Sequence, residues 1–445
     1  MYRLLLRRDF GLMWSGHLLS NLGNWLLILA IPVYVFELTG SVASTSAAVV
    51  AQTVPALLVG PIAGVAADQW NRRTIMLLSD LLRALVVVGF LFVHSAGDLW
   101  LLYATVFMES CVAQLFLPAH RALLPGLVGR GADLSAANAL YTLAGGIVRL
   151  AGGPLGGALY LLLGFDALVL IDMATYVVSA VALLAVRYSP STLRAGTAGG
   201  PGHGRPVRRL RAVRRDLAEG AQVLWRSVLL IRLLASSAVF LLGNSTLTVL
   251  LVPYVYQRLH GDAALVGLLF SALGAGFLIG APPARRMADA ARPHRALAAA
   301  LAAANLSFIG LFHSQQRPIA LLSICAVGVT GGAVLVVVQT LIQRYTPDQV
   351  LGRVSSAYAS VEMLATVIGA VAGGAVAAGL GLTVAADTAI AIVAVSILLA
   401  LTLPAPAAER APESSETPPG PNWPAAQPPA EADPDSALRQ RPTPS

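Results

Sequence analysis

The 445-residue chain is 56% hydrophobic and only 12% charged. Its charged share is about half that of an average soluble protein, which excludes a soluble globular protein. Lipid must therefore cover much of its surface. Its formal net charge is +8, and all 30 basic residues are arginine, which excludes the lysine-dependent P-loop nucleotide sites and Schiff-base cofactors. We interpret Cys111 and Cys325, both in apolar runs, as small buried side chains rather than a disulfide or metal site.

Twelve apolar runs have about the 20 residues that a helix needs to span a membrane. In chain order they are 11–36, 43–66, 74–93, 99–119, 138–162, 166–187, 229–256, 264–283, 296–313, 318–342, 355–379 and 383–403. The run 296–313 is the weakest of them, because it is short and rich in alanine. The sequence therefore predicts an all-α integral membrane protein with twelve transmembrane helices in two six-helix bundles.

Arginine is unevenly distributed between the predicted loops. With the N-terminus in the cytoplasm, 25 arginines lie in cytoplasmic segments and only two, Arg258 and Arg317, lie in outside loops. By the positive-inside rule, this asymmetry predicts a multi-pass protein of the bacterial inner membrane with both termini cytoplasmic. It also accounts for the positive net charge without nucleic acid as a partner.

The composition along the chain divides it into four parts. Residues 1–187 are predicted to form an N-terminal six-helix bundle and 229–403 a C-terminal one. Between them, 188–228 form a cytoplasmic linker rich in Arg, Gly and Pro, and 404–445 form a disordered Pro-rich cytoplasmic tail.

A glycine pattern recurs in the two predicted bundles and favours an internal duplication. Gly156, Gly157 and Gly164 are matched by Gly373, Gly374 and Gly381 at a constant offset of 217 residues. Transporters built from parallel repeats bind their substrate between the two halves.

The loop between the second and third runs carries a charged motif made of Gly64, Asp68, Arg72 and Arg73. Glycine permits close helix approach, the aspartate can accept hydrogen bonds at a helix end, and the arginines can bond terminal carbonyls or acidic residues. These residues can form the latch of a gate, with Glu362 in the eleventh run as the partner of Arg72 or Arg73. The alternative is an ordinary positive-inside loop.

With this motif the chain resembles the major facilitator superfamily, and further residues are similar to its exporter branch of macrolide efflux proteins and siderophore exporters. These residues are Phe10, Trp14, 38–41, Pro55, 79–85, Pro118, Ala119, Arg121, Leu124, Pro125, 137–140, Gly153, Pro154, Gly156, Gly157 and 352–354. The resemblance covers about residues 3–403. It implies the major facilitator fold and transport by alternating access, in the outward direction. Ala284 stands where a second latch would have its Asp.

Glycine is unusually frequent in the fifth run. Gly153, Pro154, Gly156 and Gly157 resemble the Gly-Pro-Gly-Gly stretch of exporters that exchange substrate against protons. Each glycine inside a helix costs stability, so close packing of small residues is an equally good reading and is compatible with the first.

Charged residues inside the runs indicate function, because a charge in lipid is costly. Glu109 lies near the predicted membrane midplane and is the first candidate for carrying a proton, with Arg149 as its expected partner. Asp172 lies nearer the outer end and is a further proton-coupling candidate, although a structural residue or part of an outer-facing site is the simpler reading. We expect Asp80 and Arg83, three residues apart, to pair with each other.

Uncharged polar residues within the runs are candidates for contacting a substrate. They are Asn21, Asn24, Asn244 and Gln339. The cavity around them is expected to include Trp25, Tyr34, Phe240 and Tyr254, and the alternative is that these aromatic residues anchor the helices at the membrane interface. A cavity with few charges suits a hydrophobic or amphiphilic compound.

These observations predict a monomeric secondary transporter that exports a small hydrophobic or amphiphilic compound, such as an antibiotic or siderophore, in exchange for protons and without a cofactor. An importer or lipid flippase on the same fold, or a sensor or scaffold that does not transport, are the alternatives. The His-Glu-x-x-His and Gly-x-Ser-x-Gly patterns of enzymes are absent from the sequence.

Overall fold

The structure is a computed structural model that describes residues 2–129, 131–187, 222, 224–225, 227–288, 293–346 and 348–403. Residues 1–404 form one compact unit, separate from 405–445. The tail predicted at 404–445, and nearly all of the linker predicted at 188–228, lie outside the described residues. The described part is built from helices.

The first six predicted spans are helices. They lie in α2 Arg8–Thr39, α3 Val42–Gln69, α4 Arg72–Val87, α5 Leu99–Val128 and α6 Ala132–Ala185. A four-residue helix, α1 Tyr2–Leu5, precedes them, and 3-10 turns lie at Val88–Phe92 and Ala96–Asp98. The 54-residue α6 is two helices, because the backbone leaves the helical region at Gly164, with φ of 80°. The fifth and sixth spans meet at this residue.

The second six predicted spans are helices as well. Their bounds are α9 Val228–Gln257, α10 Ala263–Ala288, α11 Pro293–His313, α12 Arg317–Tyr345, α13 Asp348–Leu380 and α14 Leu382–Leu401. The short alanine-rich ninth run is α11. Eleven described helices are long and apolar enough to cross a membrane, and α6 counts twice, so the prediction of twelve spans is confirmed.

The two halves repeat the same turn at the same place. Gly164 joins the fifth and sixth spans with φ of 80°, and Gly381 joins the eleventh and twelfth with φ of 92°. Residues other than glycine rarely adopt such positive φ values. The need for a positive φ therefore explains why both Gly164 and Gly381 are glycine.

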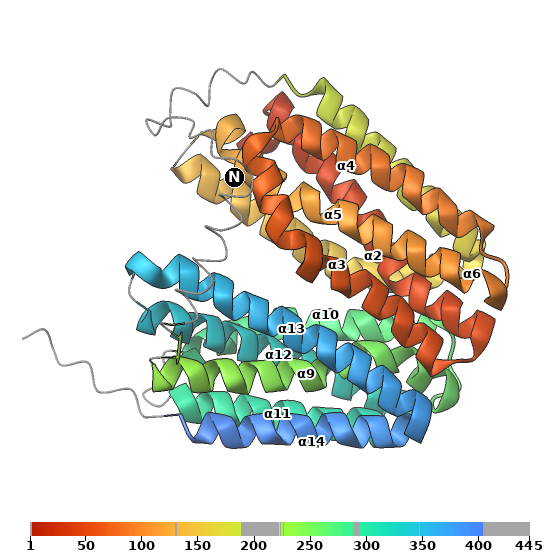
Figure 1. The fold of residues 1–445 in the computed structure, drawn as a ribbon, viewed down its shortest axis with the longest axis vertical. Coiled ribbons are helices and arrows are strands. Elements are labelled where there is room, and N and C mark those ends of the chain that lie inside the picture. Colours follow the sequence, from red (N-terminus) through yellow and green to blue (C-terminus); the bar gives the residue numbers. More distant parts are fainter. Residues whose placement is uncertain are drawn as a thin grey trace, which may run out of the picture. The chain divides into compact units, whose positions relative to one another are not determined.

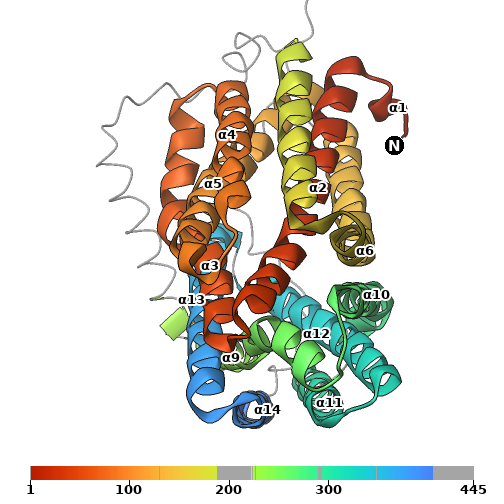
Figure 2. The same cartoon turned by 90° about the vertical axis from the view of Figure 1, so that its right-hand side faces the viewer.

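Small residues form the contact between the halves. A side chain on Gly157 of α6 would meet the carbonyl oxygen of Ala263 in α10 at 2.6 Å, and one on Gly374 of α13 would meet Ser46 of α3 at 2.4 Å. Because Gly157 and Gly374 correspond in the duplication, α6 on α10 and α13 on α3 are equivalent contacts. Figures 1 and 2 show these pairs bridging the red-to-yellow and green-to-blue helices.

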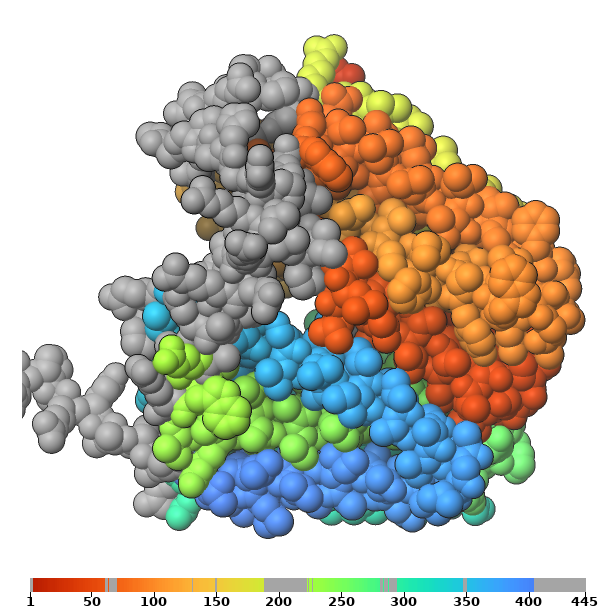
Figure 3. Space-filling view, viewed as in Figure 1, coloured from red at the N-terminus to blue at the C-terminus, as the bar shows by residue number. Residues whose placement is uncertain are grey.

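The contacts between the halves gather at one end of the helices. We call the side where α2 begins the N-terminal face and the other side the opposite face. Ala263 begins α10 and Ser46 lies in the first turns of α3, so both glycine contacts lie toward the opposite face. In the space-filling view, the N-terminal half and the C-terminal half meet on the right (Figure 3).

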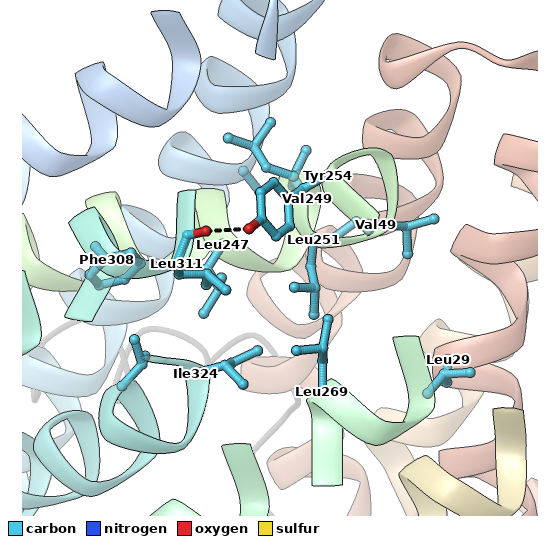
Figure 4. Packing of buried hydrophobic residues seen from close by; sticks show 14 of the residues in the cluster. Leu29, Val49, Leu247, Val249, Leu251, Tyr254, Leu269, Phe308, Leu311 and Ile324 are labelled. Carbon is cyan, nitrogen blue, oxygen red and sulfur yellow. Dashed lines mark hydrogen bonds between the residues drawn. The ribbon is translucent and has the colours of Figure 1, made fainter. Parts of the chain in front are cut away.

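One large cluster of buried apolar residues runs through both halves, and a second, smaller cluster lies in the N-terminal half. In the C-terminal half, Tyr254 is fully buried, and its hydroxyl donates to the carbonyl oxygens of Leu311 and Ser314, while its ring packs on Phe312 (Figure 4). Tyr34 is similarly used in the N-terminal half, where its hydroxyl donates to Val93 at 2.7 Å. Tyr34 and Tyr254, expected in the substrate cavity, are therefore structural residues.

Candidate functional site

A buried ion pair joins three helices in the N-terminal half. Arg83 of α4 places Nη2 at 2.6 Å and Nε at 2.7 Å from the same oxygen, Oε1 of Glu109 in α5. Tyr176 of α6 donates its hydroxyl to that oxygen at 3.2 Å, and its ring lies 4.1 Å from the Arg83 guanidinium carbon. A hydrogen-bonded pair of this kind holds its charges where isolated ones are costly.

Two further carboxyl groups lie beside this pair. Asp80 of α4 and Asp172 of α6 have no exposed surface, and neither accepts a hydrogen bond from a described residue. Asp172 is near enough to Arg83 and Glu109 to interact with both electrostatically. The described side chains of this cluster therefore carry three carboxyl groups and one guanidinium group.

Asp172 also touches the helix that leads to the central cavity. Its Oδ1 would lie 2.5 Å from a Cβ atom on Gly23 of α2. A side chain at position 23 would displace the carboxyl group. Two residues further along α2, Trp25 lines the cavity between the halves. One short segment of α2 thus contacts both the acidic cluster and the cavity.

The structure corrects the expected pairing of these charges. Arg83 does not form an ion pair with Asp80 three residues earlier, since its side chain extends across to Glu109 on α5. Arg83 therefore occupies the place expected for Arg149, whose side chain lies outside the described residues. Asp172, expected to be a structural residue or part of an outer-facing site, is buried beside this pair in the arrangement described.

A cavity of about 240 Å³ lies between the two halves. It is lined by Trp25, Ile28, Pro32, Val49, Gln52, Thr248, Val252, Phe270, Leu273, Gly274 and Phe277. These residues belong to α2 and α3 of one half and to α9 and α10 of the other, so a bound molecule would touch both. The lining is apolar apart from Gln52, Thr248 and the indole N–H of Trp25, which suits a mainly apolar ligand.

The polar residues expected to contact a substrate do not all line one cavity. Asn21, Asn24 and Asn244 are half-buried and are not among the residues that line this cavity. Gln339 lines a second cavity, together with Glu362. The sequence analysis missed Gln52 and Thr248, since single polar residues in apolar runs give no sign of the direction in which they face.

The predicted latch is not closed in this structure. Glu362 accepts a hydrogen bond from Ser237 of α9 at 2.5 Å, and no ion pair joins it to Arg72 or Arg73, all of which are described. Arg73 instead donates to the carbonyl oxygens of Leu183 and Leu184 near the end of α6, at 2.8 and 2.6 Å.

The expected pairing of Glu362 with these arginines is therefore wrong for the arrangement described. The reason is that the end of α6 already uses Arg73, while Ser237 holds Glu362 within the other half. Gly64 and Asp68 lie in the last turns of α3, but the Asp68 side chain lies outside the described residues.

The glycines of the fifth span pack closely on two helices. Gly153 and Gly157 face α10, where a side chain on Gly153 would meet the carbonyl oxygen of Gly267 at 2.7 Å, while Gly156 faces Leu26 of α2. Pro154 is exposed on the surface of the helix. The alternative of tight packing between small residues is thus the geometry seen for these three glycines.

A contact that the sequence analysis missed closes the opposite face. Glu37, near the end of α2, accepts hydrogen bonds from Tyr160 of α6 at 2.5 Å and from Tyr256 of α9 at 2.7 Å. The ring of Tyr256 also packs on Phe36, with 5.3 Å between centroids. Since α2 and α6 belong to one half and α9 to the other, this carboxylate joins the halves.

Comparison with known proteins agrees with this architecture. Residues 4–429 match the family described as transmembrane secretion effector. An uncharacterised MFS-type transporter of Bacillus subtilis, YfiS, is 28% identical over 396 residues, which is 86% of this chain and 91% of the relative. The multidrug efflux pump Tap of Mycolicibacterium fortuitum is 24% identical over 82% of this chain and 88% of its own length.

Two more matches extend this picture. Macrolide efflux protein A of Streptococcus pyogenes is 27% identical over 40% of this chain and 44% of its own length. The crystal structure of a bacterial homologue of the iron transporter ferroportin, in an inward-facing state, superposes with a TM-score of 0.69 at 17% identity, covering 90% of this chain and 99% of that one. The chain therefore belongs to the transmembrane secretion effector family of the major facilitator superfamily.

Proposed function

We propose that the protein is a secondary active transporter that exports a small hydrophobic or amphiphilic compound in exchange for protons, by alternating access between its two halves. One observation carries this proposal. Three carboxyl groups and one guanidinium group are buried together in the N-terminal half, next to the α2 segment that lines the cavity between the halves.

The charge balance of this cluster favours proton carriage. If Asp80, Glu109 and Asp172 were all ionised around Arg83, the described cluster would hold two uncompensated negative charges away from water. Each buried, unpaired charge costs several kcal/mol, so at least one of the carboxyl groups holds a proton in this arrangement. Glu109 is held by the Arg83 guanidinium and the Tyr176 hydroxyl, whereas only neutral hydroxyl groups lie beside Asp80 and Asp172. We therefore assign the proton to Asp80 or Asp172.

Contact with α2 supplies the coupling. Asp172 packs on Gly23, and Trp25 reaches the cavity. A compound that moves α2 on entering the cavity therefore changes the space around the Asp172 carboxyl group. Protonation of that group and occupancy of the cavity then favour different positions of the same helix, which is what exchange between the two requires.

The relatives support outward transport, and the arginine distribution supports the orientation in the membrane. Tap and macrolide efflux protein A are efflux proteins by name, and we take this protein to share that direction. The excess of arginine supports a cytoplasmic N-terminal face in a bacterial inner membrane. In this orientation, the contacts of Glu37 and of the glycines close the outer side, so the arrangement faces inward. We propose that it acts as a monomer.

Transport in reconstituted vesicles tests this function. Erythromycin is chosen because one relative is a macrolide efflux protein. We expect it to accumulate in inside-out proteoliposomes with an acidic lumen, beyond the passive trapping of this weak base in protein-free vesicles under the same gradient. Asp172→Asn should abolish the dependence on the gradient while leaving erythromycin binding intact. Asp387→Asn is the matched control, because Asp387 is an exposed carboxylate that pairs with His313. Gradient-driven accumulation in Asp172→Asn equal to that of the wild type would refute the proton role of this cluster.

A further inference from the structure

A second cavity, of about 400 Å³, lies in the C-terminal half between α12 and α13. It is lined by Leu335, Val336, Val338, Gln339 and Thr340 from α12 and by Glu362 from α13. The first cavity, between the halves, has no charged lining residue, and neither does a third, beside the start of α9. Glu362 therefore sets this cavity apart.

The Glu362 carboxylate has no positive partner in the protein as described. Its described hydrogen bond comes from the neutral hydroxyl of Ser237, at 2.5 Å. No ion pair joins it to a described arginine or histidine. It is half-buried, so its charge is only partly screened by water. A carboxylate in such a place attracts a cation from outside the protein.

We propose that this cavity binds the positively charged nitrogen of an amphiphilic cation, with Glu362 as its counter-ion. This inference rests on the proposed function only in taking a small compound as the transported molecule. It adds that the compound is a lipophilic amine or a quaternary cation, a class that the apolar cavity between the halves does not select.

The rest of the lining fits both parts of such a molecule. Leu335, Val336 and Val338 give an aliphatic wall for its apolar body. The Gln339 side chain is exposed at the cavity and offers a carbonyl oxygen to an N–H group. Thr340 donates its hydroxyl to the Val336 carbonyl at 2.8 Å, which leaves the oxygen lone pairs to accept.

The same lining works against other ligands. An anion would face the Glu362 carboxylate, and a neutral molecule would gain nothing from it while still displacing water from the charge. Specificity for cations thus comes from a penalty on the alternatives as well as from attraction.

Direct binding to the purified full-length protein tests this site without a proton gradient or transport. The probes are tetraphenylphosphonium, a lipophilic cation, and triphenylphosphine oxide, a neutral molecule of similar shape. We expect Glu362→Gln to weaken tetraphenylphosphonium binding about tenfold, corresponding to about 1.4 kcal/mol, and to leave triphenylphosphine oxide binding unchanged. Asp387→Asn, which removes an exposed carboxylate on α14, should change neither.

A second variant keeps the test open if Glu362→Gln is poorly folded. Gln339→Glu adds a carboxylate at an exposed position of the same cavity, so it should fold and tighten tetraphenylphosphonium binding about threefold, an effect in the usual range for partly exposed ion pairs. Equal cation affinity in wild type, Glu362→Gln and Gln339→Glu would overturn the proposal. An equal loss for the neutral probe would overturn it too, since Glu362 would then act only on structure. If the wild-type protein does not bind tetraphenylphosphonium, the proposed cation site is wrong, whereas the proposed function is judged by the effect of Asp172→Asn in the vesicle experiment.

Discussion

Replacing Tyr256 by phenylalanine should loosen the closed opposite face by a predictable amount. The hydroxyl of Tyr256 donates to Glu37 at 2.7 Å across the halves, and Glu37 keeps its second bond, from Tyr160 at 2.5 Å. The substitution therefore leaves no orphaned carboxylate, and the ring contact with Phe36 remains. What is lost is one hydrogen bond to a charged group, worth about 1.5 kcal/mol or more when buried. Because this one is exposed, we take ~1 kcal/mol, or roughly a fivefold shift toward the state open at this face.

Spin labels on the opposite face measure this shift. His94 and Gln315 are exposed residues in the connections that follow α4 and α11, one in each half, and they can carry the labels once the two native cysteines are replaced by serine. The Tyr256→Phe protein should show about five times the population of the longer distance. Tyr160→Phe is the matched control, because that bond lies within one half. The reasoning fails if Tyr160→Phe shifts the distances as much as Tyr256→Phe, or if neither does.

Three further substitutions test other parts of the structure. Arg83→Met should lower the free energy of unfolding by about 3–5 kcal/mol, because it leaves buried carboxyl groups without a cation. Adding Glu109→Gln should restore part of this loss. A double variant no more stable in thermal unfolding than Arg83→Met would count against the ion pair. Gly157→Val should abolish erythromycin transport in vesicles, because the new side chain clashes with α10. Gly145→Val should keep transport, because a side chain there meets no neighbour within 4 Å. Similar transport by both variants would argue against the clash. Arg73→Gln removes two hydrogen bonds to carbonyl oxygens at the end of α6 and should cost about 1–2 kcal/mol of stability, which an unchanged melting temperature would contradict.

The spans were predictable because the membrane imposes a simple rule on the sequence. About twenty apolar residues are needed to cross it, and backbone groups must bond within the segment. Even α11, the short and alanine-rich one, obeys this rule. The sequence singled out Gly164 and Gly381 as repeated glycines, but their positive φ values became evident only in the structure.

The contacts of the site were less predictable, because sequence spacing reports neighbours along a helix and not across helices. Arg83 has Asp80 one turn away, but its long side chain reaches Glu109 on α5. The sequence did not predict a role for Glu37, because nothing in it indicates that Tyr160 and Tyr256 lie beside this residue. The sequence predicted Tyr254 in the cavity, but its hydroxyl donates to carbonyl oxygens inside the C-terminal half.

The glycine contacts between α6 and α10 have a consequence for how easily the halves can move. Interlocking side chains must change rotamer before two packed helices can tilt, and each such change adds to the activation barrier. At Gly153, Gly157 and Gly267 the backbones themselves touch, so the helices can pivot with little repacking. The time that the protein spends in one state is then governed by a few polar contacts at the ends of the helices, such as that of Glu37, where a single substitution alters it.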